Sequence, residues 1–521
     1  MNLLSGHGPT GRQPSRNHLD SLSRFDDPGF FGRMFPYLPA HAPDESHLAA
    51  LADAMKDVGL ALSSDNVHIP AGYAYLAQFI EHDISLDFTS IGEQSRDPLG
   101  LQNFRTPSLD LDSLYGCGPE GSPHLYARNP NDGNRPGPKF LIGTTVQAFR
   151  NFGNVPGRLP NDLPRNSEGF ALIADHRNDE NLLLAQLHLA LLKFHNRVVD
   201  LLEDEELTSV EAFERARQIV TWHYQWLVLH DFVERVSAPG TVERVLREGR
   251  RFFRFNRVAY LPVEFSAAAF RFADSMVRES YSHNRVFSPA SEPPVPATAR
   301  MLYTFTGRAG GIVGNLSPEP LTAPAPLNVL SSNWIIDWRR YFDLRTPAHA
   351  RFVFNHSRKL DPFLAPSLHD LPAAGGSLAM RNLRRGLHLG LPSGQDIASA
   401  MRIAHPLLPE EIGSGLDGRA AKQYGLHADT LLWFYLLKEA QLRGDGERLG
   451  PVGSRIVAEV FVGLLEGDPE SYLAQDPDWT PTLPASHRET FTMADLLTFV
   501  GDVSPIDGIT HTREGDLRLV R

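Results

Sequence analysis

The chain has 521 residues, enough for one large domain or two to three ordinary ones. Hydrophobic residues make up 42% and charged residues 21%, as in soluble globular proteins, and the net charge of −12 gives no electrostatic basis for nucleic-acid binding. A single cysteine, Cys117, excludes an intramolecular disulfide framework and a cysteine-based zinc site. The sequence contains neither an apolar stretch of signal-peptide type nor 18 consecutive apolar residues. We therefore expect a cytoplasmic protein without a transmembrane segment.

The pattern of the sequence predicts a mainly α-helical protein with long loops. Strand-like alternation is scarce, whereas proline and glycine are plentiful, with 40 and 42 residues. We expect a flexible tail over residues 1–22, one large domain over 23–500 and a polar C-terminal tail over 501–521. Segments with helical periodicity include Leu48–Met55, Gly169–Asp200, Val210–Arg235, Glu264–Tyr281, Ser377–Ser399, Leu431–Leu437 and Ile456–Leu465.

The stretch Gly72–Ser90 organises the rest of the sequence. Its residues Gln78, Glu81 and His82 are spaced by three and four, so on a helix they share one face among apolar neighbours. Such a face is costly to bury unless a polar group or a metal lies opposite. A lone histidine on an apolar helix is more often a packing residue, and on this stretch alone the two interpretations are about equal.

A second polar pattern lies in a loop in which Thr106, Ser108, Asp110 and Asp112 alternate with other residues. In an extended loop, alternation turns these oxygen groups to one side, where they suit a hard cation such as Ca²⁺. Asp83 could add a third carboxylate. The alternative is a solvated acidic turn, which the spacing alone favours.

Two further helices carry charged residues. In Gly169–Asp200, Asn178 or Asp179 is the expected N-cap, and Arg177 and Glu180 lie three residues apart at the helix start. His188 and His195, further along, are expected to pack or to form hydrogen bonds.

In the predicted helix Glu264–Tyr281, Asp274 stands among apolar residues. A buried carboxylate needs a cation, a metal or hydrogen-bond donors.

Together these segments resemble the animal-type haem peroxidase family, also called the peroxidase–cyclooxygenase superfamily, and are most similar to its bacterial members. The resemblance extends from about Phe25 to about Leu497. It implies a mainly α-helical peroxidase fold, with haem between Gly72–Ser90 and Glu264–Tyr281. The motifs that carry it are AQFIEHD, RTPSLDLDSLYG, RNDENLLLAQLHLALLKFHNRV, AAAFRFADSMV and NLRRGLHLGLP.

The resemblance implies a role for each residue of the distal site. His82 matches the distal histidine, the general base toward hydrogen peroxide, and Gln78 matches the glutamine that lines the peroxide or halide site. Arg177 matches the distal arginine, which stabilises charge as the O–O bond breaks. Glu81 and Glu180 match acidic residues that can form ester links to haem b.

The family's calcium ligands also have counterparts here. Asp83 matches the ligand next to the distal histidine, and the loop ligands match Thr106, Ser108 (through its carbonyl), Asp110 and Asp112.

On the proximal side the chain departs from the family. Ala273-Asp274 stands where the family has Gly-His, whose histidine is the axial ligand of iron. Asp274 could ligate ferric iron through oxygen, and Asn382, which matches the asparagine that orients the proximal ligand, could then donate a hydrogen bond to it. Arg271 and Arg385 match arginines near the haem propionates.

This departure leaves three outcomes: an altered but active peroxidase, a haem protein with another activity, or a pseudoenzyme without haem. His283 follows the expected helix end and is not expected to replace the ligand. The fatty-acid-oxygenating branch has a radical tyrosine where this chain has Arg271, which argues against cyclooxygenase chemistry.

The resemblance implies haem-dependent oxidation of a small organic molecule or an anion by hydrogen peroxide. The alternative is a non-catalytic, Ca²⁺-stabilised scaffold that has lost haem.

Overall fold

The structure is a computed structural model that describes residues 29–59, 64–86, 103–130, 133, 135–147, 154–291, 294–304, 306, 329–344, 353–371 and 376–509. The predicted N-terminal tail, and residues 510–521 of the predicted C-terminal tail, lie outside this range. Val503 and Ile506 are buried, so the chain continues to pack against the core beyond residue 500.

Helices dominate the fold, as the sequence predicts. The α-helices are α2 (Glu45–Ala54), α3 (Gly72–Ile84), α5 (Asp112–Tyr115), α6 (Gly118–Gly121), α7 (Leu182–Leu201), α8 (Ser209–Trp226), α9 (Glu234–Val236), α10 (Thr241–Glu248), α11 (Val263–Ser266), α12 (Ala299–Thr304), α13 (Leu378–His388), α14 (Gly394–Ala400), α15 (Pro409–Ile412), α16 (Gly415–Gln423), α17 (Leu432–Arg443), α18 (Pro451–Gly467), α19 (Tyr472–Gln475) and α20 (Met493–Val500). The 3-10 turns are η2 (Pro123–Leu125), η3 (His176–Asp179), η5 (Ala269–Met276), η6 (Ser332–Trp334), η7 (Trp338–Arg340), η8 (Pro366–His369) and η9 (Pro505–Asp507).

Strands are short and pair only two by two in the part of the chain that the structure describes. β1 (Phe31–Gly32) pairs in parallel with β5 (Leu261–Pro262). The antiparallel pairs are β2 (Asp65–Pro70) with β8 (His356–Arg358), β3 (Tyr126–Asn129) with β4 (Arg135–Phe140), and β6 (Ser280–Tyr281) with β7 (Ala297–Thr298). These ribbons fasten loops to the helical core and form no larger sheet.

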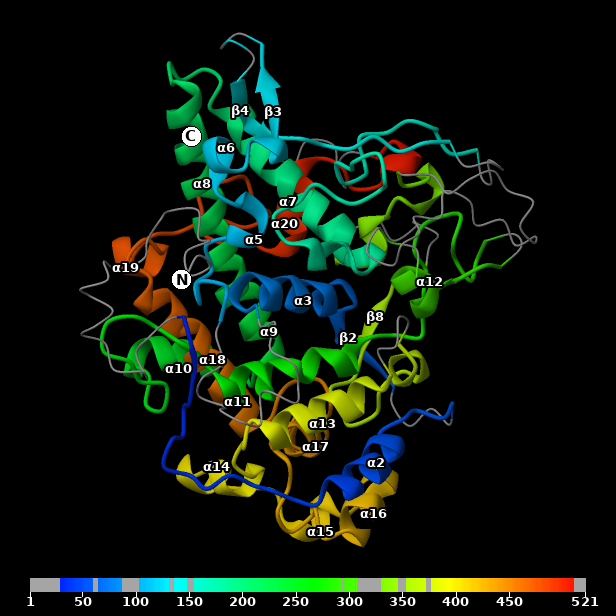
Figure 1. Ribbon diagram of the computed structural model, residues 1–521, viewed down its shortest axis with the longest axis vertical. Coiled ribbons are helices and arrows are strands. Elements are labelled where there is room, and N and C mark those ends of the chain that lie inside the picture. The colour runs from blue at the N-terminus through cyan, green and yellow to red at the C-terminus, as the bar shows by residue number, and fades with distance from the viewer. Residues whose placement is uncertain are drawn as a thin grey trace.

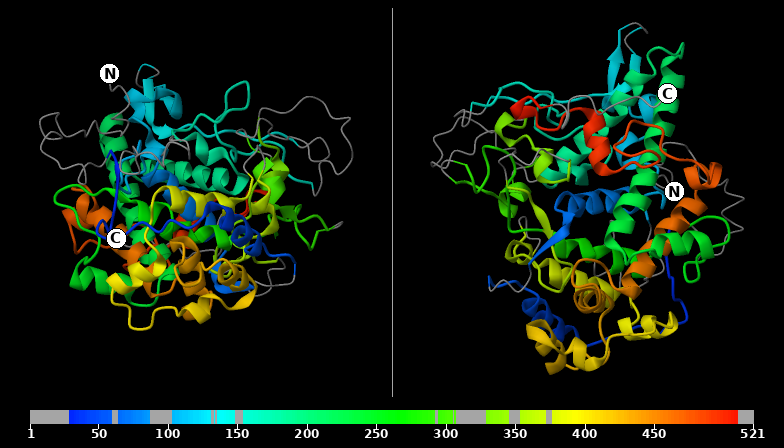
Figure 2. Two further views of the ribbon diagram at one scale, coloured as in Figure 1. Left: turned by 60° about the horizontal axis from the view of Figure 1, so that its bottom comes forward. Right: turned by 180° about the vertical axis from the view of Figure 1, so that it is seen from behind.

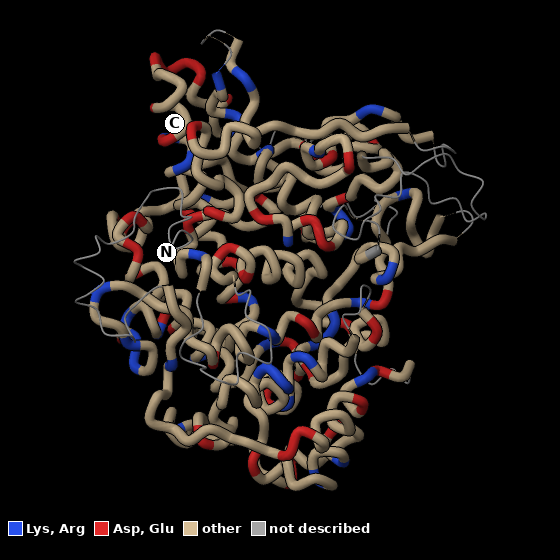
Figure 3. Tube along the Cα trace, viewed as in Figure 1, with Lys and Arg blue, Asp and Glu red and all other residues tan. Residues whose placement is uncertain are grey.

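Helix α3 lies near the centre of the molecule, with α7 on one side and the α11–η5 segment on the other (Figure 1). The views in Figure 2 show α3 enclosed by other segments from several directions. All of α3 is buried except Gln78 and Glu81, which are partly exposed. In the view of Figure 3, acidic and basic residues are interspersed along the described trace. Among the described helices, none combines the length and the hydropathy that crossing a bilayer would need.

The predicted helix over Gly72–Ser90 is shorter than expected. It ends at Ile84, because Ser85 has extended backbone angles (φ −142°, ψ 138°) and its amide closes the last turn on the carbonyl of Glu81. Residues 87–90 of the predicted stretch lie outside the described residues.

The prediction of one continuous helix over Glu264–Tyr281 is wrong. Ala268 leaves the helical region (φ −135°, ψ −67°) between α11 and the 3-10 segment η5. Side chains occupy carbonyls that an α-helix would need: Trp433 donates its indole N–H to Arg271 O at 3.1 Å, and the Ser275 hydroxyl donates to Phe272 O at 2.8 Å. Tertiary contacts therefore override the helical pattern of this segment.

The predicted N-cap of the long helix is also displaced. The cap is Asn181, whose Oδ1 accepts from the amide of Leu184 at 2.8 Å. The turn η3 precedes it and is capped by Asp175, so Asn178 and Asp179 belong to a separate turn.

Several predicted helices are confirmed. Ser393 caps α14, its side chain accepting from the amide of Asp396, and the apolar runs in α17 and α18 are buried. The predicted helix Val210–Arg235 is present as α8 and α9, joined by the π-helical segment η4 (Leu227–Val233).

Candidate active site

Helix α3 and turn η3 hold the predicted distal histidine between them. His82 Nδ1 lies 2.8 Å from Asn178 Oδ1, and its Nε2 lies 3.7 Å from Glu180 Oε1. Burial lowers the pKa of His82, and the nearby charge of Arg177 lowers it further, against a smaller opposing effect of Glu180. A neutral imidazole with Nδ1 bound to Asn178 leaves Nε2 as the basic nitrogen.

Gln78 lies one turn before His82 and is fixed at both ends of its amide. Its Nε2 donates to Glu180 Oε1, and its Oε1 accepts from Asn181 Nδ2 at 2.9 Å. The structure thus brings Glu180 to Gln78 and His82, although it lies about a hundred residues away in the sequence.

Arg177 is held by a carboxylate of its own turn. Its Nε and Nη2 donate to Asp175 Oδ1 and Oδ2 at 3.0 and 2.7 Å, and Nη2 also donates to the carbonyl of His82 at 2.8 Å. Although burial alone would raise the pKa of Asp175, hydrogen bonding from Arg177 and the charge of Arg105 hold it well below its usual range. The predicted distal arginine is therefore anchored to the backbone carbonyl of the histidine that it is expected to assist.

An ion pair links α3 to η5. Arg271 Nη2 lies 2.5 Å from Glu81 Oε1, and both side chains are partly exposed. Burial raises the pKa of Glu81, but the charge of Arg271, with smaller effects from His82 and Arg177, brings it below the usual value. Arg385, on α13, adds a further contribution of the same sign.

Asp274 is half-buried on η5, and Asn382 Nδ2 donates to its Oδ2 at 2.7 Å. The hydrogen bond that the sequence suggested between these two residues is therefore present. Burial raises the pKa of Asp274 to about 6, against the lowering effects of Arg271 and of the hydrogen bond from Asn382.

His283 is fully buried, and both of its ring nitrogens are engaged. Nδ1 lies 3.1 Å from the hydroxyl of Tyr341, and Nε2 lies 2.8 Å from the carbonyl of Trp334. Burial lowers the pKa of His283 to about 4. Its place in this network agrees with the expectation that it does not replace the proximal ligand.

Seven of the predicted haem-site residues are partly exposed, whereas His82 and Asn382 are buried. The partly exposed residues are Gln78, Glu81, Arg177, Glu180, Arg271, Asp274 and Arg385. Arginines that can pair with propionates, together with carboxylates and a histidine as donor groups, fit the chemistry of an anionic iron porphyrin.

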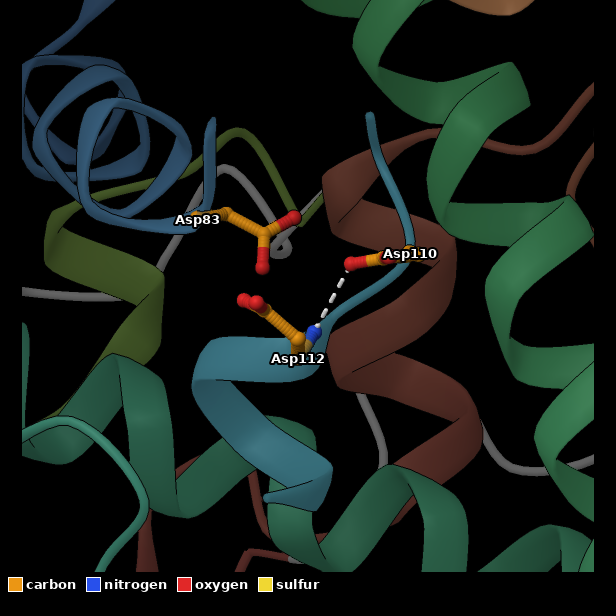
Figure 4. A group of neighbouring side chains, drawn as sticks. All are labelled: Asp83, Asp110 and Asp112. Atoms are coloured by element: carbon orange, nitrogen blue, oxygen red, sulfur yellow. Dashed lines mark hydrogen bonds between the residues drawn. The ribbon is translucent and has the colours of Figure 1, made fainter. Parts of the chain in front are cut away.

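Three carboxylates form a compact cluster, which we call the cation cluster: Asp83 on α3, Asp110 in the loop before α5, and Asp112 at the start of α5. One oxygen each of Asp83, Asp110 and Asp112 lies within 4.8 Å of the others, and Figure 4 shows the three side chains converging. Burial, with repulsion from Asp110, raises the pKa of Asp83 to about 7, and burial with the charge of Asp468 raises that of Asp110 to about 6. Burial and Asp110 raise the pKa of Asp112 well above its usual value. Buried carboxylates that resist ionisation together fit a divalent cation.

The other two predicted cation ligands lie in the same loop. Ser108 is buried and hydrogen-bonds to Asp110, whereas Thr106 is exposed and its carbonyl accepts from the amide of Ser108 at 2.8 Å.

Sequence reasoning did not identify four groups that complete these sites. Asn178 and Asn181 fix His82 and Gln78, Asp175 anchors Arg177, and Arg105 lies between the cation cluster and Asp175. Asn178 and Asn181 belong to the RNDEN motif, and Arg105 opens RTPSLDLDS. These residues could have been identified as site residues because they are polar and lie next to a predicted functional residue in the same motif.

Comparison with known proteins gives one family match. Residues 65–307, slightly less than half of the chain, match the animal haem peroxidase family, and this segment contains every distal and cation-cluster residue described above. The segment is therefore similar to that family.

Two curated relatives are peroxidase-like. The chain is 25% identical over 448 residues to the human protein named probable oxidoreductase PXDNL, covering 83% of this chain and 26% of that protein. It is 25% identical over 340 residues to a peroxidase-like protein of Margaritifera margaritifera, covering 61% of this chain and 40% of that protein. The chain therefore matches less than half the length of each.

Solved structures share the fold. Peroxidase A from Dictyostelium discoideum superposes with a TM-score of 0.56 and 15% identity, covering 96% of this chain and 98% of that one. The fatty acid α-dioxygenase of Arabidopsis thaliana superposes with a TM-score of 0.53 and 14% identity, covering 91% of this chain and 80% of that one. The fold is thus that of peroxidases and dioxygenases, and at these identities the likeness concerns the fold alone.

Proposed function

We propose that this chain is a haem-dependent peroxidase that uses hydrogen peroxide to oxidise a small organic molecule or an anion, with a carboxylate on the proximal side. Its haem peroxidase-like domain would extend over residues 23–500. The observation that supports this best is the fixed orientation of His82: Asn178 binds Nδ1, and Nε2 is left on the side of Glu180.

In this proposal His82 Nε2 accepts a proton from hydrogen peroxide. The lowered pKa of His82 keeps the ring neutral, and therefore able to accept, at neutral pH. Arg177 supplies a permanent positive charge as negative charge develops on the departing oxygen, and Asp175 holds it in place. Two electrons from the substrate and two protons complete the reduction of peroxide to water.

A bound haem would supply the redox chemistry at its iron. Asp274 would face the iron, with Asn382 fixing its carboxylate, and Arg271 and Arg385 would pair with the propionates. Glu81 and Glu180 would lie near the haem edge, where ester links can form. An anionic oxygen ligand favours ferric iron and lowers the reduction potential relative to histidine.

A second candidate function is a peroxidase-like scaffold without haem. The observation that favours it is the pKa of Asp274, raised to about 6 by burial, because a site that disfavours the carboxylate anion also disfavours the form that ligates iron. In that case the cation cluster would serve the stability of the fold alone.

The test is the haem content and the absorption spectrum of the full chain produced with ample haem, beside Asp274→His and His82→Ala variants. We expect stoichiometric haem in the parent, and a rate of reaction with hydrogen peroxide that falls about 1,000-fold in His82→Ala. His283→Gln is the matched control, because this histidine is engaged elsewhere and its loss should leave haem content unchanged.

The outcomes separate the two candidates. If only Asp274→His binds haem, the parent chain is a peroxidase-like scaffold without haem and without peroxidase activity. If the parent and His82→Ala both bind haem and react with hydrogen peroxide equally fast, the assignment of His82 as the distal base is wrong.

A further inference from the structure

Arg105 lies between the cation cluster and the residues that hold the distal arginine. It is buried, with 9% of its surface exposed; its Nη1 lies 3.0 Å from Asp112 Oδ1 and its Nη2 lies 2.6 Å from Asp175 Oδ2. Asp112 belongs to the cation cluster, whereas Asp175 does not. The guanidinium of Arg105 thus forms ion pairs with two carboxylates that belong to different sites.

From Asp175 the contacts continue into the candidate active site. The same Asp175 Oδ2 that accepts from Arg105 also accepts from Arg177 Nη2 at 2.7 Å, and Arg177 Nη2 donates to the carbonyl of His82 at 2.8 Å. Charges alternate along this line of Asp112, Arg105, Asp175 and Arg177.

A cation and Arg105 compete for the same carboxylate. A divalent ion held by Asp83, Asp110 and Asp112 would attract Asp112 and repel Arg105. Asp83, Asp112 and Arg105 are buried, so solvent and salt screen the repulsion between the ion and Arg105 only weakly. Arg105 would then shift its bonding toward Asp175, which it shares with Arg177.

We propose that Arg105 is a positioning residue that couples cation binding at Asp83, Asp110 and Asp112 to the placement of Arg177. The part that concerns catalysis rests on the proposed function, in which Arg177 is the distal arginine. Coupling between two sites is reciprocal, so a change at Arg177 must alter cation affinity. That consequence can be measured without haem or peroxide.

The experiment is a double-mutant cycle on the haem-free full chain, with Ca²⁺ affinity measured by calorimetric titration. The four proteins are the parent, Arg177→Gln, Arg105→Gln and the double variant. Loss of Arg177 leaves Asp175 wholly to Arg105, draws Arg105 away from Asp112 and frees that carboxylate. We expect Arg177→Gln to bind Ca²⁺ about fivefold more tightly than the parent.

In the Arg105→Gln background, the same change at Arg177 should alter Ca²⁺ affinity by less than about twofold, because the connecting group is gone. The cycle subtracts the direct through-space effect of removing a positive charge, which acts in both backgrounds. Equal effects of Arg177→Gln in the two backgrounds would overturn the proposal, as would a parent chain that binds no Ca²⁺.

Two further variants test whether the result of the cycle could come from general destabilisation by the loss of a buried arginine. Arg165 is a buried arginine that likewise binds two carboxylates, Asp162 and Asp179, neither of which lies in the cation cluster. Arg165→Gln in place of Arg105→Gln should leave the effect of Arg177→Gln intact. Arg105→Lys should retain only part of the coupling, because a single ammonium group cannot bind Asp112 and Asp175 at the same time as well as a guanidinium does.

If Arg105→Gln fails to fold, Asp175→Asn breaks the same line at its next member and should likewise abolish the effect of Arg177→Gln on Ca²⁺ affinity. Persistence of the full effect in Asp175→Asn would refute the coupling. If haem never binds but the cycle shows coupling, the proposed function fails while this inference stands.

Discussion

Asn178 lies between two histidines and gives each a different part of its amide. Its Oδ1 is 2.8 Å from His82 Nδ1, and its Nδ2 is 3.0 Å from His188 Nδ1. Burial lowers the pKa of His188 to about 3, so this ring is neutral and accepts from the amide NH₂. The amide is therefore oriented, and His82 carries its proton on Nδ1.

This arrangement predicts the effect of Asn178→Ala on haem-loaded protein. Without the acceptor, His82 loses its fixed tautomer, and we expect reaction with hydrogen peroxide to slow about 100-fold in stopped-flow measurements. Asn178→Asp, which keeps the acceptor oxygen, should lose much less. An undiminished rate in Asn178→Ala would show that His82 does not need this partner.

His188 also predicts a dependence of stability on pH. Its folded-state pKa, about 3, lies below the ordinary 6.5, so below pH 6.5 the unfolded chain binds a proton that the folded chain does not. This group therefore lowers the free energy of unfolding as pH falls, by about 2 kcal/mol between pH 6.5 and 5.

His188→Gln keeps an acceptor for Asn178 and removes the titrating group. Its unfolding free energy, measured by urea denaturation across this pH range, should fall less steeply than that of the parent. Parallel curves for the two proteins would contradict the prediction.

Cation removal should destabilise the chain. Without an ion, the buried Asp83 and Asp112 and the partly buried Asp110 lie together with raised pKa values, so ionising them opposes folding. Treatment with a chelator should lower the melting temperature by about 5 °C, and added Ca²⁺ should restore it. Asp110→Asn should melt at the same temperature with and without chelator; a persisting shift there would place the cation elsewhere.

The start of α3 depends on a close approach of backbone and ring. A Cβ built on Gly72 would lie 2.3 Å from Phe342 Cζ, so Gly72→Ala should destabilise the protein by about 3 kcal/mol in thermal unfolding. Gly386, inside α13, has no neighbour nearer than 3.6 Å. Gly386→Ala is therefore the control, and should stabilise by about 0.5 kcal/mol. Equal effects of the two substitutions would refute the steric argument.

Local sequence patterns predict which residues lie close together in the candidate site better than they predict the ends of the helices. The spacing of Gln78, Glu81 and His82 places them on one face of α3, and the alternation of Asp110 and Asp112 brings both to the cation cluster. These patterns are local, so the sequence carries them.

Long-range contacts account for what the sequence does not predict. Trp433 takes up a carbonyl of η5 from 162 residues away, which local propensity cannot register. Arg105 and Asp175 approach each other across 70 residues, and neither residue type is distinctive on its own. Which charged residues form ion pairs depends on the packed fold, whereas a motif can be identified from the sequence alone.

The cation cluster also links two segments that are distant in the sequence. Asp83 lies in the last turn of α3, whereas Asp110 and Asp112 lie beyond residues 87–102, so one ion bound by all three would tie the ends of a loop of roughly 30 residues in the folded chain. Unlike a disulfide, the ion would be released on unfolding, so its stabilising effect would rise with the concentration of free Ca²⁺. With Cys117 as its single cysteine, the chain would thus have a reversible cross-link whose strength depends on free calcium rather than on redox conditions.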